Sequence, residues 1–151
     1  MEFSFAYASR QCKEYAKLGL LGVTVLYSSG DYGVAGFNAL CLDPNGMNIP
    51  LLNAILIEAS RAGNQTVNGK IFNPRFPSTC PYVTSVGATQ LSHGKTVLDK
   101  EDACVEVIQS GGGWSNYFAM PDYQKSAVSS YLKNTPPAYP SSIWNSTGKV
   151  G

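Results

Sequence analysis

A short apolar run that stops at a glycine-rich turn constrains this chain more than any other feature. Val23–Tyr27 carries no charge and is rich in β-branched residues, and the turn Ser28–Gly33 follows it directly. Such a run predicts a buried, parallel strand. In α/β folds, functional groups gather beyond the carboxyl ends of parallel strands. Asp31 lies there, between Gly30 and Gly33, whose missing side chains allow a ligand to approach the backbone. Asp31 is therefore a candidate functional residue.

Two amphipathic segments predict helices. The first covers Arg10–Leu18, with Ser9 as its amino-terminal cap and Gly19 as its stop. The second covers Tyr123–Leu132 and begins at the cap residue Asp122. Helices placed around strands in this order predict an α/β fold in a single domain.

Three further segments complete the expected organisation. Tyr82–Val86 predicts a second buried strand, and the stretch Gly63–Pro81, rich in Gly, Asn and Pro, predicts a long surface loop. Ile49–Ala59 is strongly apolar and is expected to form a short helix that packs on the body. It is too short for a membrane hairpin, and no segment reaches the roughly 20 apolar residues that span a bilayer.

The charge content excludes several kinds of partner. Charged residues make up 14% of the chain, and 11 basic against 10 acidic residues leave a net charge of +1. Such a chain has no field that would attract nucleic acid or an anionic membrane, and no basic cluster supplies one. We therefore expect neither partner.

Cysteines and glycosylation motifs point to a secreted protein. The four cysteines form no CxxC pair and allow three disulfide pairings; they are Cys12, Cys41, Cys80 and Cys104. Glycosylation motifs occur at Asn64 and Asn145. The first residues lack the basic and apolar segments of a signal peptide, so we expect the chain to be part of a longer extracellular protein.

Six sets of segments follow one another along nearly the whole chain: Gln11–Tyr15 with Lys17–Gly19, Gly22–Leu26, Ser29–Gly33, Phe72–Pro74, Phe76–Gly87 and Ser110–Phe118. In this order and approximate spacing they resemble the sedolisin family of serine-carboxyl peptidases. The likeness is nearest to the secreted fungal tripeptidyl-peptidases.

The resemblance implies a subtilisin-like α/β fold, a parallel sheet flanked by helices, present here as an incomplete fragment. Residues 1–151 would be part of a peptidase catalytic domain, with an atypical apolar insert at about 47–62. One hypothesis is that this insert is translated from unspliced sequence. The implied activity is cleavage of peptide or protein substrates at acidic pH, as a tripeptidyl-peptidase or an endopeptidase. In this family a Ser nucleophile is activated by a Glu that an Asp orients.

The resemblance also implies site residues in this chain. Asp31 would help to form the oxyanion hole, which requires a protonated carboxyl, and burial beside apolar neighbours favours that form. Activity would then fall as the pH rises and the carboxyl ionises. The competing interpretation is that Asp31 only satisfies turn amides. The expected substrate-binding residues are Ser29, Gly30, Ser110, Gly111, Gly112 and Gly113.

Other catalytic parts of the family are missing from these residues. The helix with the Glu and Asp and the Gly-Thr-Ser phrase of the nucleophile do not occur, so we expect the chain alone to be inactive. Ser110 and Ser115 flank the glycine run but are not interpreted as nucleophiles. The family's calcium loop lies outside the chain, so no metal or cofactor is assigned to it; the acidic and amide residues that fail to form an EF-hand are Asp43, Asn45, Asp99 and Asp102.

Two other functions remain as alternatives. The first is a non-catalytic secreted module that binds peptides. The second takes Gly30–Gly36 as a nucleotide loop, but its glycine spacing departs from G-x-G-x-x-G and the residues that follow are turn-like. Binding of unreactive peptides by the folded chain would favour the first alternative.

Overall fold

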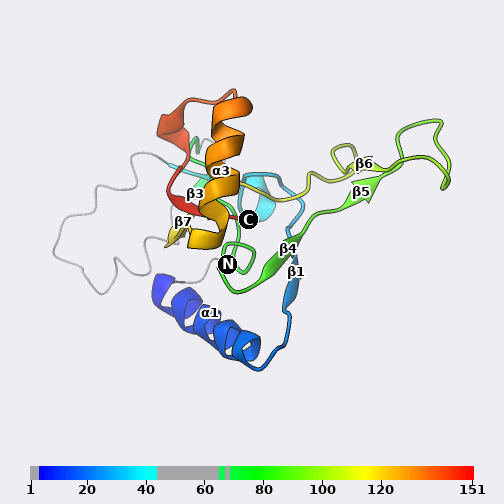
Figure 1. Ribbon diagram of the computed structural model, residues 1–151. Coiled ribbons are helices and arrows are strands. Elements are labelled where there is room, and N and C mark those ends of the chain that lie inside the picture. The colour runs from blue at the N-terminus through cyan, green and yellow to red at the C-terminus, as the bar shows by residue number, and fades with distance from the viewer. Residues whose placement is uncertain (1–3, 44–64, 67–68) are drawn as a thin grey trace.

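The computed structural model describes residues 4–43, 65–66 and 69–151. In this part of the chain it is a small α/β unit with two longer helices and four two-stranded sheets (Figure 1). The helices are α1 (Phe5–Leu20) and α3 (Asp122–Asn134), and two 3-10 turns, η1 (Phe37–Ala39) and η4 (Ser141–Ile143), accompany them. The paired strands are β1 (Leu26–Ser28) with β4 (Thr84–Val86), β2 (Cys41–Leu42) with β3 (Gln65–Thr66), β5 (Thr89–Gln90) with β6 (Asp102–Ala103), and β7 (Trp114–Ala119) with β8 (Gly148–Val150).

Capping interactions define both ends of α1. The Ser4 side chain accepts a hydrogen bond from the backbone N–H of Tyr7 at 3.3 Å. At the other end Gly22 has a φ of 79°, and the N–H of Val23 bonds the carbonyl of Leu18 at 3.0 Å. This is a Schellman ending, in which glycine adopts the left-handed conformation without a steric penalty.

The predicted boundaries of the first helix are wrong. Ser9 and Gly19 both lie inside α1. Ser4 provides the same capping chemistry one turn earlier, and the helix continues past Gly19 until Gly22 reaches a positive φ. The predicted last helix is confirmed, but Asp122 is its first residue and the cap position is Pro121.

Both predicted strands are confirmed, and the structure pairs them with each other in parallel. β1 and β4 run parallel with Tyr27 opposite Ser85, although each strand is shorter than predicted. Their predicted burial is wrong, since Leu26 is 63% exposed and Val86 49% exposed. A parallel sheet is normally covered on both faces. Among the described residues no layer covers these two side chains.

A disulfide ties α1 to the segment that leads into β4. Cys12 and Cys80 are bonded with their Cα atoms 5.6 Å apart, whereas Cys41 and Cys104 are free. The two bonded cysteines form the core with Tyr15, whose hydroxyl lies 2.8 Å from that of Tyr27. The sequence left three disulfide pairings open, and the observed bond belongs to the one that joins Cys12 to Cys80.

The predicted surface loop Gly63–Pro81 is only partly described, and its described part is not a surface loop. Asn73, Thr79 and Cys80 are each at most 1% exposed. The disulfide at Cys80 holds this segment against α1, which explains its burial. The apolar segment Ile49–Ala59, the expected insert at about 47–62 and Asn64 lie outside the described residues.

Removal of the disulfide tests its role. We expect Cys12→Ala together with Cys80→Ala to lower the free energy of unfolding by about 2–5 kcal/mol, because the bond closes a long loop in the unfolded chain. Urea unfolding of the two proteins measures the difference.

Cys41→Ala is the matched control, because Cys41 is free. This variant and the native chain should both unfold at a lower urea concentration when a thiol reductant is added. A native chain whose unfolding midpoint does not change on reduction would contradict the stabilising role.

Candidate functional site

The Ser29–Gly33 turn leaves the carboxyl end of β1 and remains bonded to β4. The backbone N–H of Ser29 donates to the carbonyl of Val86 at 2.9 Å. Ser29 is buried at 8% exposure, and Gly30 adopts a φ of 96° that favours glycine. The strand end therefore fixes the start of the turn.

A second segment, distant in sequence, pairs with this turn. The N–H of Gly111 donates to the carbonyl of Gly30 at 2.9 Å, and the N–H of Gln109 donates to the carbonyl of Asp31 at 3.0 Å. The N–H of Gly33 returns a bond to the carbonyl of Gln109 at 2.9 Å. The turn and the start of the glycine run thus form one backbone ladder.

This ladder requires a glycine at position 111. A Cβ atom built on Gly111 would lie 1.9 Å from the carbonyl oxygen of Ser29, which is far inside van der Waals contact. A Cβ atom on Gly112 would meet nothing within 4 Å. The close approach of the two backbones therefore depends on the first glycine of the run.

Both serines beside the glycine run have structural hydrogen bonds. The Ser110 hydroxyl accepts from the N–H of Ala88 at 2.8 Å and lies 3.1 Å from the Ala88 carbonyl. The Ser115 hydroxyl accepts from the N–H groups of Tyr117 at 3.0 Å and Phe118 at 2.9 Å. These contacts give each hydroxyl a role in holding backbone.

Asp31 lies at a cavity of about 450 Å³ beyond the ends of β1 and β4. Its side chain is exposed, so the burial that the sequence interpretation invoked is wrong for this chain. The described residues leave this side of the turn open. Six of the residues that line the cavity are Leu26, Ser29, Gly30, Asp31, Val86 and Ile108.

A second cavity, of about 550 Å³, lies on the other side of the glycine run, against α3. Trp114 contributes an indole N–H that is buried without a partner among the described residues, and its rings lie 4.4 Å from those of Trp144. The sequence reasoning missed this cavity, although the spacing of Gln124, Val128 and Tyr131 along α3 was a usable signal. Most of its lining is apolar and includes Val34, Phe72, Trp114, Val128, Tyr131 and Tyr139.

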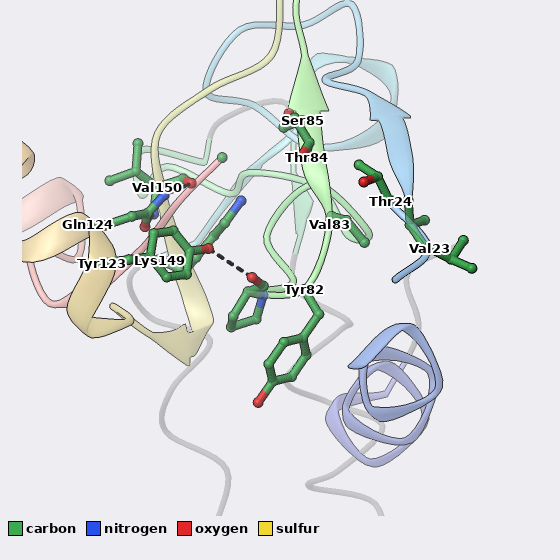
Figure 2. Close-up of a pocket in the computed structure, with 13 residues that line it drawn as sticks. Val23, Thr24, Tyr82, Val83, Thr84, Ser85, Tyr123, Gln124, Lys149 and Val150 are labelled. Atoms are coloured by element: carbon green, nitrogen blue, oxygen red, sulfur yellow. Dashed lines mark hydrogen bonds between the residues drawn. The ribbon is translucent and has the colours of Figure 1, made fainter. Parts of the chain in front are cut away.

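Lys149 is the third site feature, and nothing in the sequence pattern indicated it. This lysine is 2% exposed, and its amine donates to the carbonyl of Ser78. Burial lowers the pKa of Lys149 to about 8. Lys149 is one of the residues that line a cavity of about 530 Å³, together with residues of the segment that leads into β4 (Figure 2).

The acidic residues considered as metal ligands do not converge. The Asp99 carboxylate accepts from the backbone and the hydroxyl of Thr96, and these bonds lower the pKa of Asp99. Asp102 accepts from the Ser92 hydroxyl. In the described ranges no three His, Cys, Asp or Glu side chains form a group that could hold a metal ion.

Asn145, a predicted glycosylation site, is half-buried. Its amide nitrogen donates to the carbonyl of Ser115 at 2.8 Å, and its amide oxygen accepts from the hydroxyl of Thr147 at 2.7 Å. One amide hydrogen can make the first bond, which leaves the other for substitution. Glycosylation at Asn145 stays a prediction.

Comparison with known proteins finds relatives that match most of this chain. It is 44% identical over 139 residues to Aorsin of Aspergillus oryzae, a match that covers 89% of this chain. It is 41% identical over 143 residues to Tripeptidyl-peptidase SED1 of Arthroderma otae, covering 87% of this chain, and 35% identical over 148 residues to Tripeptidyl-peptidase 1 of Bos taurus, covering 97%. The chain belongs to the sedolisin family. No family model matches it.

This sedolisin chain spans about a fifth of the length of its curated relatives. The matched part is 19% of Aorsin and of SED1 and 21% of the bovine protein. Neither helix in the described part of the chain has the length and apolar character that crossing a membrane requires.

Substitution of the two adjacent glycines tests the backbone ladder. We expect Gly111→Ala to lower the free energy of unfolding by about 1–3 kcal/mol, because its Cβ would overlap the Ser29 carbonyl. Urea unfolding followed by tryptophan fluorescence measures the change. Gly112→Ala, the matched control, should cost less because that position is open. Equal effects of the two substitutions would contradict the close approach.

Proposed function

We propose that the chain is the central part of the catalytic domain of an acid-acting serine-carboxyl peptidase, a tripeptidyl-peptidase or an endopeptidase. One observation carries the proposal. The backbone ladder holds the Ser29–Gly33 turn against Gln109–Gly112, so that two phrases typical of the family meet beyond the same strand ends. Relatives named tripeptidyl-peptidases, at 35% and 41% identity, support peptide-bond cleavage.

The glycine run is suited to an extended peptide. Its segment donates to the turn, while the carbonyl oxygens of Ser110, Gly111 and Gly112 accept no hydrogen bond from any other described residue. Main-chain pairing of this kind holds peptides at a strand edge. The apolar cavity beside Gly113 offers space for an apolar side chain of the peptide. Ser29 and Gly30 contribute by fixing the run in place.

In this proposal Asp31 stabilises the oxyanion that forms when the peptide carbonyl is attacked. The nucleophile and its Glu–Asp pair come from sequence outside these 151 residues, because the Gly-Thr-Ser phrase does not occur in them. Other parts of the domain would cover the open side of the turn where Asp31 is exposed. The chain by itself then binds but does not cleave.

The same proposal includes the architecture and setting of the parent protein. Its fold would be subtilisin-like, with β1 and β4 as part of a larger parallel sheet, and the parent would be extracellular. Residues 47–62 would be an insert; the pairing of β2 with β3 supports this, because it brings both flanks of that region together. Calcium, where the parent protein binds it, would be held by segments outside these residues.

A chimera tests the role of Asp31. In Tripeptidyl-peptidase SED1 of Arthroderma otae, the stretch that matches this chain is replaced by residues 1–151 without 47–62. We expect Asp31→Asn in this chimera to lower kcat about 10²–10³-fold, as the loss of one oxyanion donor does. Release of tripeptides from a chromogenic peptide at acidic pH gives the rate.

Asp122→Asn is the control, because Asp122 is an exposed carboxylate that pairs with the neighbouring Lys125 on the surface of α3. It should leave kcat unchanged. An Asp31→Asn chimera with the full rate would remove the oxyanion role. Tripeptide release by the 151-residue chain alone would show that the proposed absence of a nucleophile is wrong.

A further inference from the structure

Lys149 holds a segment that lies far from it in sequence. Its amine donates a hydrogen bond to the backbone carbonyl of Ser78, and both residues are buried, at 2% and 5% exposure. The hydroxyl of Ser78 in turn donates to the carbonyl of Ser28 at 3.1 Å. Ser28 is the last residue of β1, and the turn that carries Asp31 begins directly after it. Two hydrogen bonds therefore connect the amine to the strand end from which the turn leaves.

The main chain beside Lys149 is held to the glycine run. The N–H of Gly151 donates to the carbonyl of Gly113 at 2.9 Å. The side-chain amide of Gln124 donates to the carbonyl of Val150 at 3.0 Å and accepts from its N–H at 2.9 Å (Figure 2). The end of β8 thus has a fixed position relative to the glycine run.

Together with the backbone ladder, these contacts form a closed ring of hydrogen bonds. Its links join Ser28 to Ser78, Ser78 to Lys149, Gly151 to Gly113, and Gly111 to Gly30. Short stretches of chain, 28–30, 111–113 and 149–151, connect one link to the next. A change at one link must be taken up by the others. The amine supplies a charge to the ring, and charge-assisted hydrogen bonds are roughly twice as strong as neutral ones.

We propose that Lys149 is a positioning residue for the Asp31 turn: acting through Ser78, its ammonium fixes the carboxyl end of β1 against the glycine run. The effect on catalysis rests on the proposed function, in which this turn supplies an oxyanion donor. Such donors work because they are held in place before the reaction, and a displacement of about 1 Å can cost about 100-fold in rate. Lys149 and Asp31 line different cavities, so Lys149 acts through the ring and not by touching the reacting groups.

The proton on the amine gives the ring a measurable signature. Burial lowers the pKa of Lys149 to about 8, and above that pH the hydrogen bond to Ser78 loses its charge assistance. The other titratable groups at this cavity are the phenols of Tyr82 and Tyr123 and, in the 151-residue chain, the terminal carboxylate of Gly151. That carboxylate is ionised at every pH above about 5. Burial, with a smaller contribution from Tyr82, raises the pKa of Tyr123. A transition near pH 8 at these contacts therefore reports Lys149.

The first experiment follows the carbonyl ¹³C resonances of the 151-residue chain by NMR between pH 6 and pH 10. We expect the signals of Ser78, Ser28 and Gly30 to shift together with a midpoint near pH 8. Lys149→Met should abolish this transition. Ser78→Ala should keep it at position 78 and lose it at Ser28, because the second link is missing. Lys125→Met removes an exposed lysine of α3 and, as the control, should leave the transition unchanged.

Two results of this experiment would overturn the proposal. The first is a native chain in which Ser28 shows no transition near pH 8. The second is a transition at Ser28 that persists undiminished in Ser78→Ala. Neither result depends on peptidase activity.

The second experiment measures catalysis in the chimera, where residue 151 is internal and carries no terminal carboxylate. Lys149→Met should lower kcat about tenfold with little change in KM, because the turn acts on the transition state. Lys149→Arg keeps the charge and should restore most of the rate. A full kcat in Lys149→Met, or a loss confined to KM, would overturn the proposal. If Lys149→Met does not fold, Ser78→Ala takes its place with the same expected split between kcat and KM.

The two proposals fail separately. A full rate in the Asp31→Asn chimera removes the oxyanion role of the turn. A full rate in Lys149→Met beside a slow Asp31→Asn removes only the positioning role of Lys149.

Discussion

The bond between Cys12 and Cys80 is the constraint on which the rest of this structure depends. An amphipathic helix in a protein gains most of its stability from tertiary packing, and α1 packs through Cys12 and Tyr15. Cys80 begins the segment that enters β4, and β4 pairs with β1. Because the Ser29–Gly33 turn leaves the end of β1, the disulfide also limits where that turn can lie.

Beyond the turn, backbone hydrogen bonds hold the segments together more than side-chain packing does. Gly111 allows the glycine run to approach the Ser29 carbonyl, and the Ser110 hydroxyl anchors the run to Ala88 after β4. Three segments far apart in sequence are thus joined largely by main-chain groups. Asp31 takes part in this arrangement through its backbone carbonyl, and its side chain is exposed.

Local patterns predicted which segments of this chain form helices and strands better than they predicted how buried those segments are. Both strands and both helices followed from local patterns, but the cap of the first helix was placed at Ser9, whereas Ser4, earlier in the chain, has the same capping chemistry. Burial of β1 was predicted wrongly, since a side chain such as Leu26 is buried only if another layer covers it. The ladder between Gly30 and Gly111 could not be predicted, because no local signal reports which distant segments pair. The disulfide pairing stayed open for the same reason.

The same contrast between local pattern and burial applies to the candidate functional residues Asp31 and Lys149. Asp31 follows a strand and is flanked by glycines, so the sequence drew attention to it, yet it is exposed. Lys149 has no pattern around it, yet it is buried with its pKa lowered to about 8.

The lowered pKa of Lys149 makes the free energy of unfolding depend on pH. Between about pH 8 and the ordinary lysine value of 10.5, the unfolded chain binds more protons than the folded one, so stability rises with pH over that range. Below pH 8 both states are charged, and the full cost of burying the ammonium remains. A peptidase that acts at acidic pH would work where this cost is complete.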